Sequence, residues 1–154
     1  MDATAADTAR QIAAEHGHRP DALIEILHQL QEDLGCVPED VVPALAEALN
    51  LSRAEVHGVV TFYHDFRREP AGRHVLKLCR AEACQSMGSD ALCAHVEGRL
   101  GIACGNTSAD GRVTFEPVYC LGLCATAPSA MIDGRIVGRV TASKLDAMLK
   151  EAGA

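Results

Sequence analysis

Cysteine is the residue type with the clearest chemical potential in this sequence. The chain contains seven cysteines among 154 residues. Four of them form two closely spaced pairs, Cys79 with Cys84 (C-x4-C) and Cys120 with Cys124 (C-x3-C), and the others are Cys36, Cys93 and Cys104. Seven cysteines are too few, and of the wrong parity, for a disulfide scaffold in a chain of this length. In a reducing compartment, closely spaced cysteines bind metal or do redox chemistry.

Four thiolates can hold several kinds of group. Structural zinc accepts both spacings, and a 2Fe-2S cluster also takes four thiolates. C-x4-C opens the plant-type ferredoxin pattern, although the C-x2-C that continues this pattern is missing. A thioredoxin-type disulfide site would need C-x-x-C, and a Rieske centre would need two histidines beside the cysteines; the sequence has neither. Spacing alone therefore leaves zinc and iron-sulfur open.

The residues around the pairs favour the cluster. Gly122 stands at the centre of the second pair. A glycine there can adopt a positive φ and turn backbone N–H groups toward sulfur. Hydrogen bonds to the sulfurs tune the potential of an iron-sulfur cluster and bring less to a zinc site. Arg80 follows a ligand candidate directly, and we expect its charge to offset part of the negative charge of the site.

The elements that must position these cysteines differ between the two halves of the chain. Up to residue 68 the apolar residues recur at three- and four-residue steps, which predicts helices over about 7–16, 20–34, 38–50 and 52–63. Gly35 and Asn50 are expected to end two of these helices, and Ser52 with Glu55 fits a capping box. Thr61, Phe62, Tyr63 and Phe66 follow the same spacing and are expected in the core; the alternative is that one aromatic edge contributes to a subunit contact.

The polar segment 67–72 is predicted to link a helical N-terminal region, residues 1–68, to an α/β domain, residues 73–154. In the second part, alternating residues predict strands near 74–78 and 113–119 and a hairpin around Asp133-Gly134. Helices are expected over 89–100 and 142–151. Cys93 lies in the apolar stripe of the first of these and is expected to pack as a small hydrophobe. Each cysteine pair follows a strand, which brings four sulfurs to one edge of a sheet.

The sequence resembles the thioredoxin-like 2Fe-2S subunits of NAD-linked oxidoreductases. The resemblance rests on residues 57–63 (His-Gly-Val-Val-Thr-Phe-Tyr) with Phe66, on both cysteine pairs, and on Ala127-Pro128. It covers nearly the whole chain and implies a thioredoxin-like ferredoxin fold behind a small helical region. It also implies one 2Fe-2S cluster, bound by Cys79, Cys84, Cys120 and Cys124.

Within this family the loops 79–88 and 120–125 look most like the gamma subunit of molybdenum-containing, NAD-dependent formate dehydrogenase. That resemblance implies an electron carrier that shows no turnover alone. Its partners would be a flavin subunit that binds FMN and NAD and a catalytic subunit that holds the molybdenum cofactor. The small cluster subunit of complex I or of NAD-reducing hydrogenase is the alternative within the family. Outside it, the alternatives are a non-redox module with a structural zinc site of four cysteines and a thiol-disulfide protein.

Composition excludes several other functions. With 14 Lys and Arg against 21 Asp and Glu, the net charge is -7, so the chain lacks the basic footprint of proteins that bind nucleic acid or anionic membranes. No apolar run approaches the roughly 20 residues that span a bilayer, and the first residues do not form a signal peptide, so a cytoplasmic protein is expected. The sequence lacks G-x-G-x-x-G, G-x4-G-K-[ST] and G-x-S-x-G, so we expect no NAD or flavin on this chain itself.

Overall fold

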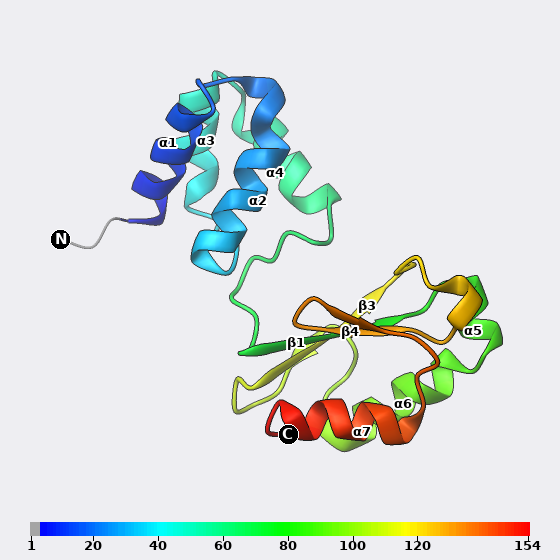
Figure 1. Cartoon of the computed structure of the whole chain (residues 1–154). Coiled ribbons are helices and arrows are strands. Elements are labelled where there is room, and N and C mark those ends of the chain that lie inside the picture. The colour runs from blue at the N-terminus through cyan, green and yellow to red at the C-terminus, as the bar shows by residue number, and fades with distance from the viewer. Residues whose placement is uncertain (1–3) are drawn as a thin grey trace. The chain divides into compact units, whose positions relative to one another are not determined.

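The computed structural model describes residues 4–154, which divide into two compact units, one that ends at Pro70 and one over Ala71–Ala154. Figure 1 shows the first as a group of helices and the second as a sheet with helices. Among residues 4–154, no helix combines the length and the apolar character that crossing a bilayer requires.

Helices make up the first unit. They are α1 (Ala5–Glu15), the short 3-10 turn η1 (Pro20–Ala22), α2 (Leu23–Leu34), α3 (Val41–Leu49) and α4 (Arg53–Phe62). Gly35 and Asn50 adopt left-handed conformations, with φ of 78° and 52°, and end α2 and α3 as predicted. Ser52 and Glu55 form the predicted capping box at the start of α4.

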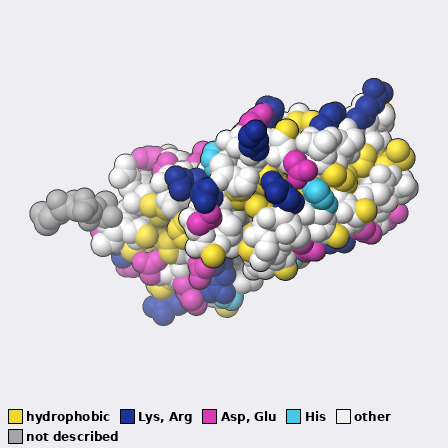
Figure 2. Space-filling view, turned by 90° about the horizontal axis from the view of Figure 1, so that it is seen from below, with side chains coloured by type: hydrophobic (Ala, Val, Ile, Leu, Met, Phe, Trp, Pro, Cys, Tyr) yellow, Lys and Arg dark blue, Asp and Glu magenta, His cyan; other side chains and the backbone are white. Residues whose placement is uncertain are grey.

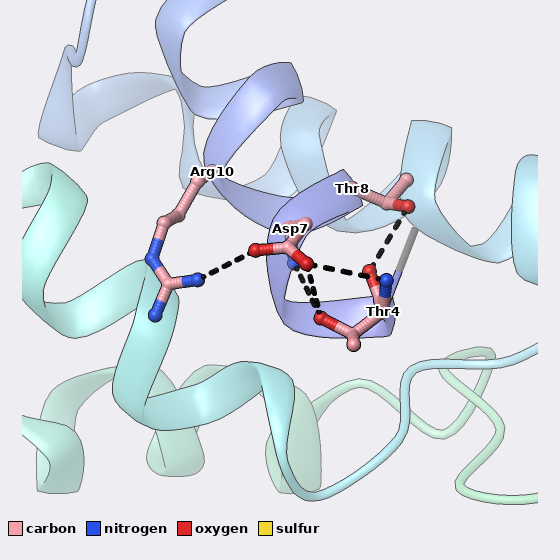
Figure 3. A network of polar contacts seen from close by, with 4 residues as sticks. All are labelled: Thr4, Asp7, Thr8 and Arg10. Carbon is pink, nitrogen blue, oxygen red and sulfur yellow. Dashed lines mark hydrogen bonds and ion pairs between the residues drawn. The ribbon is translucent and has the colours of Figure 1, made fainter. Parts of the chain in front are cut away.

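The start of α1 is closed by a second capping box, which the sequence analysis did not identify (Figure 3). The Asp7 amide donates to Thr4 Oγ1 (3.2 Å), and Thr4 Oγ1 and the Thr4 amide donate to Asp7 Oδ2 (2.7 and 3.3 Å). The hydrogen bonds from Thr4 hold the pKa of Asp7 below its usual value. Arg10 Nη1 lies 3.1 Å from Asp7 Oδ1, and the Thr8 hydroxyl donates to the Thr4 carbonyl. These contacts fix where the first helix begins.

The apolar stripes of these helices form the core of the first unit. Its fully buried side chains include Ile26, Leu27, Leu30, Leu45 and Leu49. Replacing one such leucine by alanine costs about 2–5 kcal/mol. The expectation of three buried aromatic rings is correct only for Phe66; Phe62 and Tyr63 are 74% and 42% exposed. Phe62 is the last residue of α4 and, two positions after buried Val60, lies on the opposite face of the helix. Tyr63 lies beyond the helix, in extended backbone.

The second unit is a five-stranded sheet with helices. Its elements are β1 (His74–Cys79), α5 (Glu82–Ser86), α6 (Ser89–Leu100), β2 (Asn106–Thr107), β3 (Val113–Val118), the 3-10 turn η2 (Cys124–Thr126), β4 (Ala130–Ile132), β5 (Arg135–Val137) and α7 (Ala142–Glu151). The strand order is β2-β3-β1-β4-β5. β1 and β3 run parallel at the centre, and the other pairs are antiparallel.

One face of this sheet is covered by α6 and α7, which lie beside each other in Figure 1 and contact each other. The buried residues between the layers include Leu76, Val96, Phe115, Leu145 and Leu149. The strands, the hairpin around Asp133-Gly134 and both long helices agree with the sequence analysis. Two elements were not predicted: the five-residue helix α5, which lies within the loop 79–88, and the two-residue strand β2. The α/β class is confirmed.

The surface of the molecule carries charges of both signs. Figure 2 shows Lys and Arg side chains interspersed with Asp and Glu side chains on the face in view, with small apolar areas between them. On that face the basic side chains do not gather into one continuous patch.

Candidate metal centre

Parallel pairing of the two central strands carries both cysteine pairs to one edge of the sheet. The last residue of β1, Cys79, stands opposite Val118, two residues before Cys120. The Arg80 amide donates to the Val118 carbonyl (2.8 Å), and the Cys79 amide donates to the Ser129 carbonyl (3.0 Å). These bonds fix the end of β1 between the segments that precede and follow the second pair.

Cys79 and Cys84 form the inner pair, and each is 2% exposed. Burial raises the pKa of Cys79, but hydrogen bonds from the amide of Ala81, from Cys84 and from the amides of Cys120 and Leu121 outweigh it, so the pKa lies below its usual value. Cys79 therefore loses its proton more readily than an unperturbed cysteine does. Because two of these donors belong to the loop of the second pair, the Cys79 sulfur lies against that loop.

Helix α5 positions the other inner sulfur. It begins directly after Ala81, and the Gln85 amide donates to the Ala81 carbonyl (2.9 Å), which turns Cys84 back toward Cys79. The Sγ of Cys84 lies 3.6 Å from the hydroxyl of Ser129, which is itself 1% exposed. Sequence reasoning missed this serine, and its position directly after Pro128 in the second cysteine segment was the only available signal.

Cys120 and Cys124 form the outer pair, and both are exposed. Their sulfurs lie 3.7 Å apart, and the Gly122 amide donates to the Sγ of Cys120 (3.4 Å). Gly122 has a φ of 78°, so the predicted turn of its N–H group toward sulfur is confirmed. Cys120 itself has a φ of 100°, which the sequence did not indicate. Two sulfur ligands of one tetrahedral metal lie about 3.8 Å apart for metal-sulfur bonds of about 2.3 Å, so this pair has the separation of ligands on one metal.

The charges of the four sulfurs act on one another. The pKa of Cys124 is raised by its hydrogen bond with Cys120 and by the negative charge of Cys120. Burial and the charges of Cys84 and Cys79 raise it further. Four thiolates at this edge therefore repel one another unless positive charge lies between them. The donor set fits a cationic metal group shared by both pairs.

The remaining cysteines lie elsewhere. Cys36 is buried in the first unit. Cys93 packs in the core of the second unit, as predicted, and Cys104 is partly buried against the same core. Arg80, which we expected to balance the charge of the site, donates through Nη2 to Asp90 Oδ1 (2.9 Å) on α6. Its guanidinium is therefore paired with a carboxylate rather than with one of the four sulfurs.

Comparison with known proteins identifies the family. The thioredoxin-like [2Fe-2S] ferredoxin family matches residues 9–153. The chain belongs to this family. The predicted resemblance is thereby confirmed, as is the assignment of one 2Fe-2S cluster to the chain.

Relatives in this family come from multisubunit redox complexes. The chain is 41% identical to a subunit of the NADH-quinone oxidoreductase of Pseudomonas aeruginosa over 119 residues, which cover 77% of this chain and 72% of the relative. It is 32% identical to NADP-reducing hydrogenase subunit HndA of Solidesulfovibrio fructosivorans over 129 residues, 84% of this chain and 75% of the relative.

A solved structure of an NAD+-reducing [NiFe]-hydrogenase in the H2-reduced state matches with a TM-score of 0.73 and 29% identity. The match covers 86% of this chain but only 22% of the hydrogenase chain. This chain therefore corresponds to one part of that larger polypeptide.

Proposed function

We propose that Cys79, Cys84, Cys120 and Cys124 bind the 2Fe-2S cluster and that the chain is a one-electron carrier in an NAD-linked oxidoreductase complex. The observation that carries this proposal is the convergence of the two pairs: Cys79 ends β1 opposite Val118, two residues before Cys120, and the Arg80 amide donates to the Val118 carbonyl (2.8 Å). The names of the relatives, which are subunits of an NADH-quinone oxidoreductase and of an NADP-reducing hydrogenase, support membership of such a complex.

The grouping of side chains favours a cluster over zinc. A zinc site made of four cysteines needs four sulfurs around one point. Within the described part of the chain, no three His, Cys, Asp or Glu side chains are grouped to hold a single ion. A 2Fe-2S cluster instead needs two cysteines at each of two irons. The 3.7 Å separation of the outer sulfurs agrees with one such half-site.

Bound at this edge, the cluster would supply a centre that accepts and returns one electron. The chain's own residues set its surroundings. Burial of Cys79 and Cys84 excludes water from the inner side. The amide of Gly122 and the hydroxyl of Ser129 face sulfurs and stabilise negative charge there. Exposure of Cys120 and Cys124 leaves the outer side open to a redox partner.

For the complex itself, we propose an NAD-dependent formate dehydrogenase in the cytoplasm, with this chain as its gamma subunit. The loops 79–88 and 120–125 support this branch. The partners would be a flavin subunit that binds FMN and NAD and a subunit that holds the molybdenum cofactor. The alternatives are complex I, which the name of the NADH-quinone oxidoreductase relative supports, and an NAD-reducing hydrogenase, which the matching solved structure supports. We propose a helical region over 1–68 and the cluster domain over 73–154.

Anaerobic purification of the full chain tests the cluster. We expect a red-brown protein with iron and sulfide in equal amounts and a spin-half EPR signal after dithionite reduction. Serine replacements at the four proposed ligands should abolish or alter this signal, and replacements at Cys36, Cys93 and Cys104 should retain it. A colourless protein that contains zinc would refute the electron-carrier proposal.

Isolation of the tagged chain from its native cells tests the complex. We expect a molybdenum-containing subunit to copurify and the preparation to reduce NAD+ with formate. Hydrogen-dependent NAD+ reduction, or NADH:quinone activity without formate oxidation, would replace the formate dehydrogenase assignment with one of its alternatives.

A further inference from the structure

Buried polar side chains are concentrated around the inner cysteine pair. Of the residues that the structure describes, three with polar side chains are buried: Ser89, Thr114 and Ser129, which are 0%, 5% and 1% exposed. The hydroxyl of Ser129 faces the sulfur of Cys84. The hydroxyl of Ser89 contacts the backbone of Cys79. A buried hydroxyl is costly without a hydrogen-bond partner, so its partner indicates which part of the structure it holds.

Ser89 contacts a proposed ligand residue from another element. It is the first residue of α6, and its Oγ donates to the carbonyl of Cys79 (2.5 Å), ten residues earlier in the chain. Serine hydroxyls more commonly bond to backbone groups within a few residues of themselves. Here the hydroxyl links the last residue of β1 to the first residue of α6.

This hydrogen bond closes a loop that carries both inner cysteines. The loop runs from Cys79 through α5 to Ser89, and Cys84 lies in α5. The turn that leaves α5 is also held, because the Met87 amide donates to the Cys84 carbonyl (3.2 Å). The bonds of the loop therefore restrict how far the two inner cysteines can move relative to each other.

The next residues along both elements make a second contact. Asp90 follows Ser89, Arg80 follows Cys79, and Arg80 Nη2 donates to Asp90 Oδ1 (2.9 Å). The two side chains are 33% and 63% exposed, and an ion pair this exposed contributes little by itself. The buried hydroxyl of Ser89 is therefore the stronger link between the end of β1 and the start of α6.

We propose that Ser89 is a positioning residue for the cluster: its hydroxyl fixes the backbone of Cys79 and, through it, the geometry of the inner pair. The inference rests on the proposed ligand set. Ser89 bonds to a carbonyl and not to a sulfur, so it acts through Cys79. Groups that orient the ligands of a metal site contribute about 10–100-fold to its affinity.

Ser89→Ala tests the proposal in the full chain loaded with its cluster. The substitution removes the donor to the Cys79 carbonyl, so we expect g values that differ from those of the unmodified protein in the EPR spectrum after dithionite reduction. An iron chelator should also remove the visible absorption of the variant about tenfold faster. A tenfold change in rate corresponds to about 1.4 kcal/mol, which lies within the range for a lost buried hydrogen bond.

Two further variants separate this hydrogen bond from packing and from overall stability. Ser89→Thr keeps the hydroxyl and should keep the EPR spectrum and the chelation rate of the unmodified protein. Thr114→Val removes a different buried hydroxyl, which accepts from the Gly72 amide (2.7 Å). Thr114 stands opposite Val75, near the start of β1 rather than at its end. Thr114→Val should therefore lower the unfolding midpoint and leave both cluster measurements unchanged.

Each result decides for or against the positioning role. A Ser89→Ala protein in which either the spectrum or the chelation rate is unchanged would overturn it, as would the same changes in Ser89→Thr or Thr114→Val. If Ser89→Ala takes up no cluster, circular dichroism decides. A folded chain without cluster would support the role, and an unfolded chain would overturn it.

Cys79→Ser distinguishes this failure from failure of the proposed ligand set. If Cys79→Ser leaves the EPR spectrum unchanged, Cys79 is not a ligand, and the positioning role of Ser89 is overturned with that assignment. If Cys79→Ser alters the spectrum and Ser89→Ala does not, only the positioning role fails.

Discussion

The Ser129 hydroxyl offers a sharp test of how the protein tunes the proposed cluster. It lies 3.6 Å from the Sγ of Cys84 in a buried position. With Cys84 deprotonated as a ligand, the hydroxyl is the donor of this bond. Ser129→Ala removes the donor and leaves the Ser129 carbonyl, which accepts from the Cys79 amide, in place. The substitution should therefore change the electrostatics of the site without moving the end of β1.

The size of the effect follows from the charge added on reduction. A hydrogen bond to a charged group contributes about 1.5–3 kcal/mol, and we take roughly 1 kcal/mol as the part gained when the site accepts an electron. For a one-electron couple, about 1.4 kcal/mol corresponds to about 59 mV. We therefore expect the reduction potential of Ser129→Ala to fall by about 40 mV.

An EPR-monitored redox titration measures this shift. Ser86→Ala is the matched control, because Ser86 lies two residues after Cys84 but its exposed hydroxyl donates to the Ala83 carbonyl (2.9 Å) instead of to a sulfur. Its potential should equal that of the unmodified protein. A potential of Ser129→Ala that rises, or that falls by less than about 10 mV, would refute the assigned role of the hydroxyl.

Three further predictions concern stability. Gly122→Ala should lower the free energy of unfolding by about 1 kcal/mol, because an added Cβ meets nothing within 4 Å and only the positive φ opposes it. Gly98→Ala, in α6, is equally open and should raise the free energy of unfolding by about 0.5–1 kcal/mol. Equal effects of the two substitutions in denaturant titrations would contradict this reasoning. Ser52→Ala should cost about 1 kcal/mol by removing the cap of α4, and an unchanged unfolding midpoint would argue against that role. Desolvation raises the pKa of Asp133, but its hydrogen bonds with His74 and with the Val75 amide outweigh desolvation and hold the pKa below its usual value. The carboxylate of Asp133 therefore stabilises the fold above the usual pKa of an aspartate. This contribution is lost as the pH falls through the pKa of the folded state. Asp133→Asn should accordingly be less stable at neutral pH but not in strong acid, and a uniform loss across thermal melts at several pH values would count against the ion pair.

Local rules account for the elements that the sequence predicted correctly. The left-handed caps at Gly35 and Asn50 depend on the backbone freedom of these residue types. The alternation of apolar residues along β1 and the apolar stripe of α6 indicate which side of each element faces the core. The prediction that both cysteine pairs lie at one edge of the sheet depended only on the two preceding strands running in the same direction. β1 and β3 are indeed paired in parallel.

Features that depend on tertiary contacts were not predicted. Helix α5 has five residues without an apolar stripe, so no periodicity reveals it. Phe62 lies on the face of α4 opposite buried Val60, and Tyr63 lies beyond the end of the helix. The approach of the Ser129 hydroxyl to the sulfur of Cys84 joins two segments that the sequence pattern does not relate. The types of the four proposed ligands were thus readable from the sequence, whereas their surroundings were not.

The strand lengths in the second unit also bear on self-association. The long strands, β1 and β3, lie at the centre of the sheet, and the edges are formed by β2 with two residues and β5 with three. An edge strand exposes unpaired N–H and C=O groups to which a strand of another molecule can add. Such short edges offer too few of these groups for stable intermolecular pairing. The short edge strands therefore oppose edge-to-edge association of the sheets of different molecules, even at the high concentrations used for spectroscopy or crystallisation.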